Sequence, residues 1–148
     1  MFNVAIIYAP QKSELKELAG IIKNSFNSKS FKVIIKSASQ AGIPDIAAAE
    51  ILILAGNSSG SSPIHSDFSE ILRALNGVNL AGRLAAFCAV STSDTLKAFK
   101  EALNDSEAVI GPELLMSAKD KKARKAEIKS WIKELSGKFK EMTVKYAI

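Results

Sequence analysis

The sequence predicts an α/β domain in which a five-stranded parallel sheet is covered by helices on both faces. Short apolar runs alternate with amphipathic segments along the whole chain. The apolar runs lack the polar alternation of a half-exposed strand, which indicates strands that are buried on both sides. The chain has 148 residues, 47% of them hydrophobic and 24% charged, and this suffices for a core without disulfides or metals. We therefore expect one three-layer α/β/α domain over residues 1–148.

The first half of the chain supplies three of the strands. Residues 4–8, 31–35 and 51–55 are apolar runs, and the last is the best candidate for a central strand. Residues 41–44 predict a loop, and residues 45–50 are too few to predict a helix. Between the first two strands, a helix capped by Ser13 carries apolar residues on one face. These residues are Leu15, Leu18, Ala19, Ile22 and Phe26.

A polar loop over residues 56–63 separates the third strand from the next helix. That helix is expected to begin near Ser66 or Asp67 and to end at Gly77, where a left-handed residue is favoured. Its core face is formed by Phe68, Ile71, Leu72 and Leu75.

The last third of the chain adds two strands and two helices. Residues 84–90 predict the fourth strand, and residues 91–94 offer N-caps for a helix that carries Leu96, Phe99 and Leu103. Residues 107–116 contain the fifth strand, interrupted at residues 111–112. The final helix has the clearest pattern, although Gly137 is expected to end or weaken it. Its apolar face consists of Ile128, Trp131, Ile132, Leu135, Phe139 and Met142.

The positive charge of the chain is concentrated in its C-terminal segment. Residues 116–148 hold ten Lys/Arg and four Asp/Glu, a net charge of +6, whereas residues 1–115 have a net charge of −1. A basic outer helix face is suited to an acidic protein partner. No aromatic residues interleave with the cations, so we expect no specific nucleic-acid binding. These cations are Lys121, Lys122, Arg124, Lys125, Lys129 and Lys133.

Cysteine usage and the N-terminus both favour a cytoplasmic protein. Cys88 is the single cysteine, so no intramolecular disulfide can form, and its apolar neighbours predict a buried core residue. The first residues show neither a basic n-region nor a signal cleavage site. No apolar run approaches the length of a membrane span.

The order of elements is similar to that of the flavodoxin-like family over about residues 2–136. A short first strand ends at Tyr8, and Asp45 and Glu50 precede an apolar strand that ends in a polar loop. Residues 80–87 resemble the family's entry into strand four, and a terminal helix closes the sheet. The resemblance implies strand order 2-1-3-4-5 and an FMN site in the loops after strands one, three and four.

The resemblance also assigns site residues to these three loops. Lys12 and Ser13 would contact the FMN phosphate, and the residues of the other two loops would bracket the flavin ring through backbone and hydroxyl hydrogen bonds. The candidate cofactor-binding residues are Gln11, Lys12, Ser13, Asn57, Ser58, Ser59, Gly60, Ser91, Thr92, Ser93 and Asp94.

The candidate site departs from the family pattern in every loop. Residues 9–15 contain no glycine, Pro10 lacks an N–H donor, and Glu14 places a repelling charge near a phosphate. Residues 57–63 and 90–95 contain no aromatic side chain that could stack on a flavin. Two functions stay open: electron transfer through an altered FMN site to a redox partner, or a cofactor-less binding and regulatory module that uses the basic last helix.

Three other patterns were weighed against simpler interpretations. Residues 56–60 match the G-x-S-x-G nucleophile elbow, but the elbow needs a helix directly after Ser58 and a late histidine, whereas His65 is the only histidine. We therefore favour a flexible loop there. His65 with Asp67 could relay protons, although a residue before a helix is more often a cap. One histidine and one cysteine argue against zinc.

A phosphorylated receiver domain shares this order of elements but needs different chemistry. Receivers have an acidic pair after strand one, a phosphorylated aspartate after strand three and a lysine after strand five. In this chain the three places hold residues 9–10 (Ala and Pro), Asn57 and residues 111–112 (Gly and Pro), which excludes that function.

Overall fold

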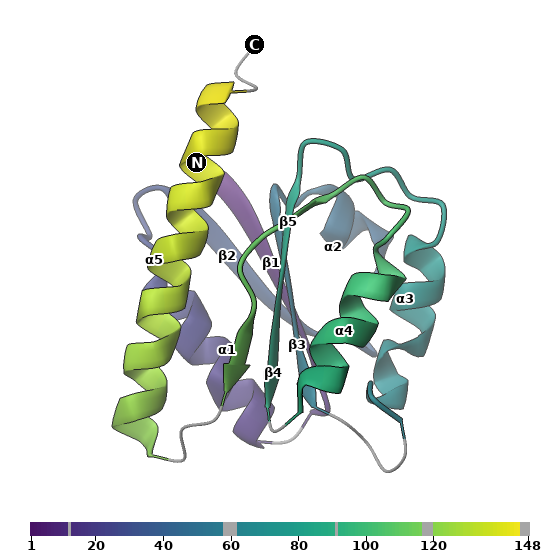
Figure 1. The fold of residues 1–148 in the computed structure, drawn as a ribbon, viewed down its shortest axis with the longest axis horizontal. Helices are drawn as coiled ribbons and strands as arrows, with labels where there is room; N and C mark the ends of the chain where they lie inside the picture. Colours follow the sequence, from purple (N-terminus) through teal and green to yellow (C-terminus); the bar gives the residue numbers. More distant parts are fainter. Residues whose placement is uncertain (12, 58–61, 91, 117–119, 146–148) are drawn as a thin grey trace.

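A parallel sheet lies between two helical layers (Figure 1) in the computed structural model, which describes residues 1–11, 13–57, 62–90, 92–116 and 120–145. The strand order is β2-β1-β3-β4-β5, and β6 also pairs with β4, which confirms the predicted order 2-1-3-4-5. The strands are β1 (Phe2–Ala9), β2 (Phe31–Ser37), β3 (Ile51–Asn57), β4 (Leu84–Val90), β5 (Val109–Ile110) and β6 (Leu114–Met116).

The predicted fifth strand is split in two. β5 pairs with the start of β4 and β6 with its end, so both lie along the same side of β4. The sequence places the interruption at Gly111 and Pro112, between the two pieces. Trp131 of the last helix contacts the segment between the two pieces. Its Nε1 donates a hydrogen bond to the Pro112 carbonyl at 2.8 Å.

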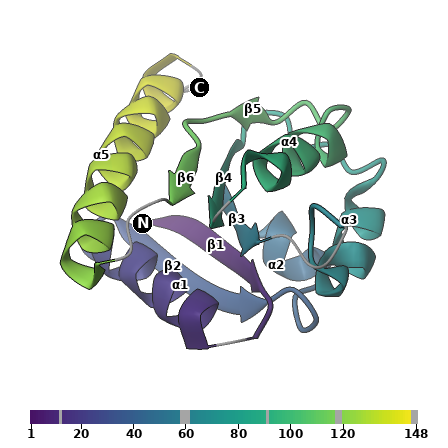
Figure 2. The same cartoon turned by 60° about the horizontal axis from the view of Figure 1, so that its bottom comes forward.

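The helices divide between the two faces of the sheet, as Figure 2 shows. α1 and α5 pack on one face, while α2, α3 and α4 pack on the other. The chain turns from strand to helix at polar loops, in the alternating order that the sequence predicts. The helices are α1 (Ser13–Ser25), α2 (Ile43–Ala47), the 3-10 turn η1 (Ser66–Phe68), α3 (Ser69–Leu75), α4 (Ser93–Ala102) and α5 (Lys121–Lys145).

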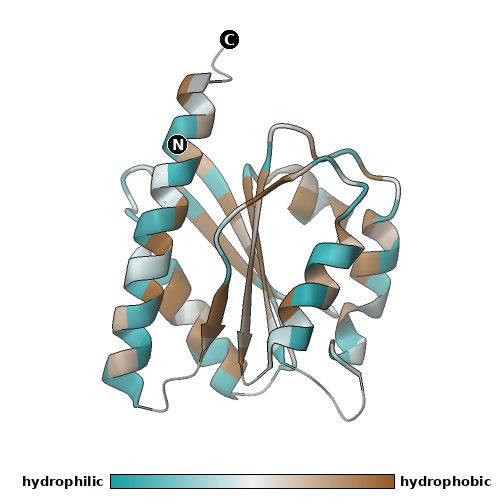
Figure 3. Cartoon of the chain, viewed as in Figure 1, coloured by the Kyte–Doolittle hydropathy of each residue, from teal (hydrophilic) through white to brown (hydrophobic). Residues whose placement is uncertain are grey.

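Both faces of the central strands are buried, which explains their uninterrupted apolar sequences. Along β1, Val4 and Ile6 face α1 and α5, whereas Ala5 and Ile7 face the opposite helical layer. Figure 3 shows the strands as a hydrophobic interior between helices with hydrophilic outer surfaces. Burying one Ile or Leu side chain contributes about 1.5–3 kcal/mol, and the two cores together hold the sheet between its layers.

Two expectations about helices were wrong. A short helix, α2, forms where a loop and a non-helical stretch were expected, because Pro44 occupies its first turn, where no backbone donor is needed. The backbone N–H of Gly42 also donates to Asp45 Oδ2 at 2.9 Å. Gly137 does not end α5, which continues to Lys145 because Phe139 and Met142 keep its apolar face on the core.

Strand β2 forms the free edge of the sheet. Lys32 and Lys36 are exposed on it, and Lys36 Nζ lies 3.1 Å from Asp45 Oδ1 of α2. The pKa of Asp45 is lowered, first by the hydrogen bond from the Gly42 N–H and then by Lys36, against the opposing effect of burial.

None of the helices formed by the described residues has the length and apolar character needed to cross a membrane.

Candidate functional site

The ends of three neighbouring strands bring the predicted loops together at one edge of the sheet. Ala9 of β1 lies opposite Gly56 of β3, and Gly56 lies opposite Ala89 of β4. The strand order reverses between β1 and β3, and ligands of such sheets bind beyond the carboxyl ends of the strands at this reversal. α1 and α4 begin at the same edge, so their positive N-terminal ends lie beside the loops (Figure 2).

The first loop leaves β1 through the buried Pro10 and passes Gln11. Gln11 Nε2 donates hydrogen bonds to Ser37 Oγ at 2.6 Å and to Ser39 Oγ at 3.2 Å. The amide nitrogen of Gln11 is therefore engaged at the end of β2, on the side of β1 away from β3 and β4. Lys12 lies outside the described residues, and Ser13 contributes the first residue of α1.

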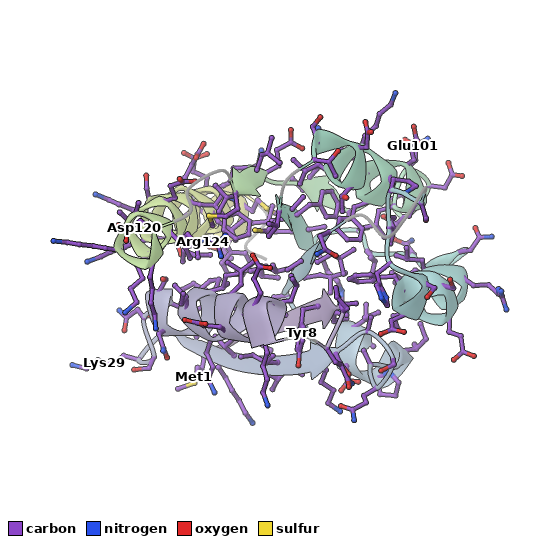
Figure 4. All side chains as sticks on the ribbon, turned by 90° about the horizontal axis from the view of Figure 1, so that it is seen from below. Met1, Tyr8, Lys29, Glu101, Asp120 and Arg124 are labelled. Carbon is purple, nitrogen blue, oxygen red and sulfur yellow. The ribbon has the colours of Figure 1, made fainter. Side chains whose placement is uncertain are left out.

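Ion pairs with α5 neutralise the acidic residues at the start of α1. Arg124 lies 3.2 Å from Glu14, the carboxylate that the sequence suggested would repel a phosphate, and Lys121 lies 2.9 Å from Glu17. The hydrogen bond and the charge of Lys121 lower the pKa of Glu17. A cavity of about 240 Å³ lies between these side chains, and Figure 4 shows Arg124 on the inner side of α5. The α1 N-terminus thus carries little uncompensated negative charge.

β3 continues two residues beyond the predicted strand end at residue 55. Asn57 is the last residue of β3, opposite Val90, rather than part of the loop. Its side chain is half-buried at the sheet edge, and its carboxamide makes no hydrogen bond to the rest of the described chain. Ser58, Ser59 and Gly60 lie outside the described residues.

Thr95, which the sequence analysis did not single out, joins the second loop to α4. The Thr95 side chain is fully buried, and its Oγ1 donates to the Pro63 carbonyl at 2.5 Å. A buried hydroxyl needs a hydrogen-bond partner. A threonine on the apolar face of the first turn of α4 is therefore the sequence feature that could have predicted this contact. This bond fixes the end of the 57–63 segment against the start of α4.

The third loop provides the N-terminus of α4. Thr92 Oγ1 accepts a hydrogen bond from the Asp94 N–H at 3.2 Å and so caps the helix, as the sequence predicted. Ser93 and Asp94 are exposed in the first turn. Ser91 lies outside the described residues. The described polar groups of this loop therefore include a capping hydroxyl and the exposed side chains of Ser93 and Asp94.

Aromatic rings approach the backbone of Gly56 closely, which favours glycine at this position. A Cβ atom there would lie 3.2 Å from the Phe68 ring and 3.3 Å from the Phe99 ring. These rings pack edge to face, with centroids 5.0 Å apart, and both are completely buried. Phe68 therefore supports the floor of the site from below and presents no face to a ligand.

The structure favours the simpler interpretations of the other motifs. Residues 62–65 are not helical, and the first helical turn described after β3 begins at Ser66, which does not favour the strand-to-helix elbow. His65 Nδ1 accepts the Asp67 N–H at 3.1 Å and caps the 3-10 turn. The same nitrogen lies 3.6 Å from the Asp67 carboxylate, too far for a hydrogen bond, so we assign His65 as a helix cap. No cluster of metal-ligating side chains occurs among the described residues.

Cys88 is a core residue, as predicted. It is fully buried in β4, and burial, with a smaller effect of Glu127, raises the pKa of its thiol from 9.0 to about 12. The thiol is therefore protonated at neutral pH and inaccessible to electrophiles.

This raised pKa predicts a loss of stability in alkali. Between about pH 9 and pH 11 the unfolded thiol releases its proton while the folded thiol keeps it, so rising pH favours unfolding by up to about 1.4 kcal/mol per pH unit. Urea unfolding at several pH values should show a shallower decline for Cys88→Ala than for the natural protein. Parallel declines in the two proteins would contradict this prediction.

Comparison with solved structures identifies the fold. The chain is similar to a short-chain flavodoxin associated with a non-canonical PDU bacterial microcompartment, with a TM-score of 0.83, 17% identity, and coverage of 94% of this chain and 99% of that one. It is also similar to an oxidised flavodoxin from Bacillus cereus (TM-score 0.81, 15% identity, 91% and 97% covered). A third similar structure is the Fusobacterium nucleatum flavodoxin bound to flavin mononucleotide (TM-score 0.74, 14% identity, 94% and 99% covered).

The sequence comparisons add no closer assignment. No protein-family model matches the chain, and no curated protein gives a significant match. The fold is therefore flavodoxin-like.

Proposed function

We propose that this flavodoxin-like chain binds FMN at the carboxyl ends of β1, β3 and β4 and serves in electron transfer. The proposal rests on one observation. Three polar segments and two helix N-termini lie at the same edge of the sheet, where the strand order reverses between β1 and β3. The Fusobacterium nucleatum flavodoxin, a solved structure similar to this chain, has flavin mononucleotide bound. FMN supplies one-electron and hydride chemistry when bound, and the protein positions it and tunes its surroundings.

The phosphate end fits the start of α1. A helix N-terminus offers unpaired backbone N–H groups and a positive dipole end to an anion. Ser13 opens this helix, and the Glu14 charge is offset by Arg124 at 3.2 Å. In this proposal Lys12 and Ser13 contact the phosphate, and backbone groups replace the hydroxyls that the family pattern would supply.

The ring end fits the segments after β3 and β4. Asn57 presents a half-buried carboxamide that makes no hydrogen bond to the described chain, so a donor and an acceptor are available there. Thr92, Ser93 and Asp94 lie at the start of α4 on the adjacent strand end. Residues 58–60 and Ser91 complete the proposed contacts with the ring. Gln11, whose amide nitrogen is already bonded to Ser37 and Ser39, could contribute only its carbonyl oxygen.

Flavin titration tests the proposal directly. Quenching of FMN fluorescence should saturate near micromolar concentrations, which corresponds to about −8 kcal/mol of binding free energy. Asn57→Ala should weaken binding by about fivefold, because it removes a hydrogen-bonding group worth about 1 kcal/mol at the ring end. Asn104→Ala is the matched control, since Asn104 is exposed after the far end of α4.

Two results would overturn the flavin proposal. One is the absence of both flavin absorption in the purified protein and quenching in the titration. The other is equal weakening by Asn57→Ala and Asn104→Ala, which would mean that binding occurs elsewhere.

A second candidate function follows from the altered first loop. Pro10 provides no N–H donor, and the Gln11 amide nitrogen is occupied. These features favour a module of the same fold that has lost the cofactor and acts through its basic last helix. Absence of flavin binding together with specific capture of an acidic partner would support this function over the first.

A further inference from the structure

One side of α5 carries a row of five lysines, in which Ser136 and Gly137 separate the last lysine from the other four. Their spacings of three, four, four and seven residues place them on one helix face. At 1.5 Å per residue the row extends over about 27 Å. We call this row the lysine stripe, and its members are Lys122, Lys125, Lys129, Lys133 and Lys140, all exposed.

Neighbouring carboxylates compensate little of the stripe's charge: Lys125 contributes to lowering the pKa of Glu17, after larger effects of Lys121 and Arg124. None of its five lysines forms an ion pair with another described residue. Glu14 and Glu17 of the adjacent helix are paired with Arg124 and Lys121, which face α1 rather than the stripe. Side chains ending in nitrogen extend from α5 away from the sheet in Figure 4.

The acidic residues of α5 lie on a different flank. Glu127, Glu134 and Glu141 recur every seven residues, about a third of a turn from the stripe. Glu134 and Glu141 line a groove with residues 110–112, beside the split strand. Lys138 lines the same groove as these glutamates, so this flank carries mixed charge, whereas the lysine stripe is purely positive and faces solvent.

Folding alone does not account for this arrangement. Lys125, Lys129 and Lys133 are successive i, i+4 neighbours, and like charges at this spacing destabilise a helix, whereas a glutamate at the middle position would stabilise it. The Lys129 side chain is exposed and forms no ion pair with another described residue. A partner with complementary charge would offset the repulsion.

We propose that the lysine stripe docks the acidic face of a protein partner, such as a helix with glutamates along one side. The stripe contains no arginine for bidentate phosphate contacts and no aromatic ring for base stacking, which argues against a nucleic-acid partner. The exposed neighbours Ala126 and Ser130 offer no apolar wedge for a lipid surface. This docking needs no bound cofactor.

Charge reversal with a matched control tests the docking. The probe is a fluorescent helical peptide of about 20 residues, long enough for the stripe, with glutamates on one face. The test variant is Lys125→Glu, Lys129→Glu, Lys133→Glu. The control is Lys16→Glu, Lys23→Glu, Lys97→Glu, which changes the net charge equally at exposed sites on α1 and α4. Circular dichroism checks that both variants remain folded.

Anisotropy should show salt-sensitive binding of the peptide to the natural protein. The stripe variant should lose at least about tenfold in affinity, and the control less than about threefold. A peptide with lysines in place of the glutamates should bind the stripe variant better than the natural protein. Flavin titration of the stripe variant should be unchanged, so failure of docking and failure of FMN binding are distinguishable.

The proposal is overturned by equal loss in both variants, which would indicate bulk charge alone. It is also overturned if duplex DNA, or vesicles of phosphatidylserine and phosphatidylcholine, bind the stripe more tightly than the acidic peptide does at the same ionic strength.

Discussion

Replacement of Phe99 by alanine is expected to lower the free energy of unfolding by about 3–5 kcal/mol. The ring is fully buried and packs against Phe68 at 5.0 Å and Phe87 at 5.7 Å between centroids. Its removal leaves a cavity beside Gly56, where the rigid strand ends β3 and β4 cannot close the space. Urea unfolding followed by far-UV circular dichroism measures the loss.

Phe2→Ala is the matched control for this substitution. Phe2 also contacts two aromatic rings, Phe31 and Phe139, but it is 41% exposed, so its removal should cost less than about 1.5 kcal/mol. Similar losses of unfolding free energy in Phe99→Ala and Phe2→Ala would contradict this prediction. They would show that the packing of Phe99 against Phe68 and Phe87 does not contribute the expected stability.

Replacement of Trp131 by alanine should also cost about 3–5 kcal/mol. Trp131 is 4% exposed, and its Nε1 donates to the Pro112 carbonyl at 2.8 Å, in the gap between β5 and β6. Trp131→Phe keeps most of the packing but leaves that carbonyl without its partner, so it should cost about 1–2 kcal/mol. Circular dichroism is the suitable signal, because Trp131 is the only tryptophan.

The pair of Trp131 variants separates packing from hydrogen bonding. If Trp131→Phe is as stable as the natural protein, the hydrogen bond to the Pro112 carbonyl contributes nothing to the free energy of unfolding. A loss below about 1 kcal/mol in Trp131→Ala would contradict its assignment to the core.

The sheet and the longer helices could be predicted because their signals are local. Continuous apolar runs predict strands that are buried on both faces, and the three- and four-residue spacings from Ile128 to Trp131 and Ile132 predict a buried helix face. α2 was missed because its stability depends on contacts outside the segment, including the ion pair between Asp45 and Lys36. Gly137 was misjudged because tertiary packing outweighs helix propensity.

The site was predicted in position but not in detail. The strand ends follow from the order of elements, so the three loops could be located from the sequence. The contact of Gln11 with Ser37 and Ser39, and the pairing of Glu14 with Arg124, join residues that are far apart in the chain. Such contacts leave no local pattern, and only the folded structure shows that the negative charge near the first loop is offset.

The free edge of β2 also affects how copies of this protein behave at high concentration. One side of this seven-residue strand pairs with β1, and its other side, with half-buried Val33, Ile34 and Ile35, is a template for pairing with a strand of another molecule. Lys32 and Lys36 stand on this edge, and two copies brought edge to edge would place like charges together. The two lysines thus oppose intermolecular β-sheet growth from an edge strand that is otherwise apolar.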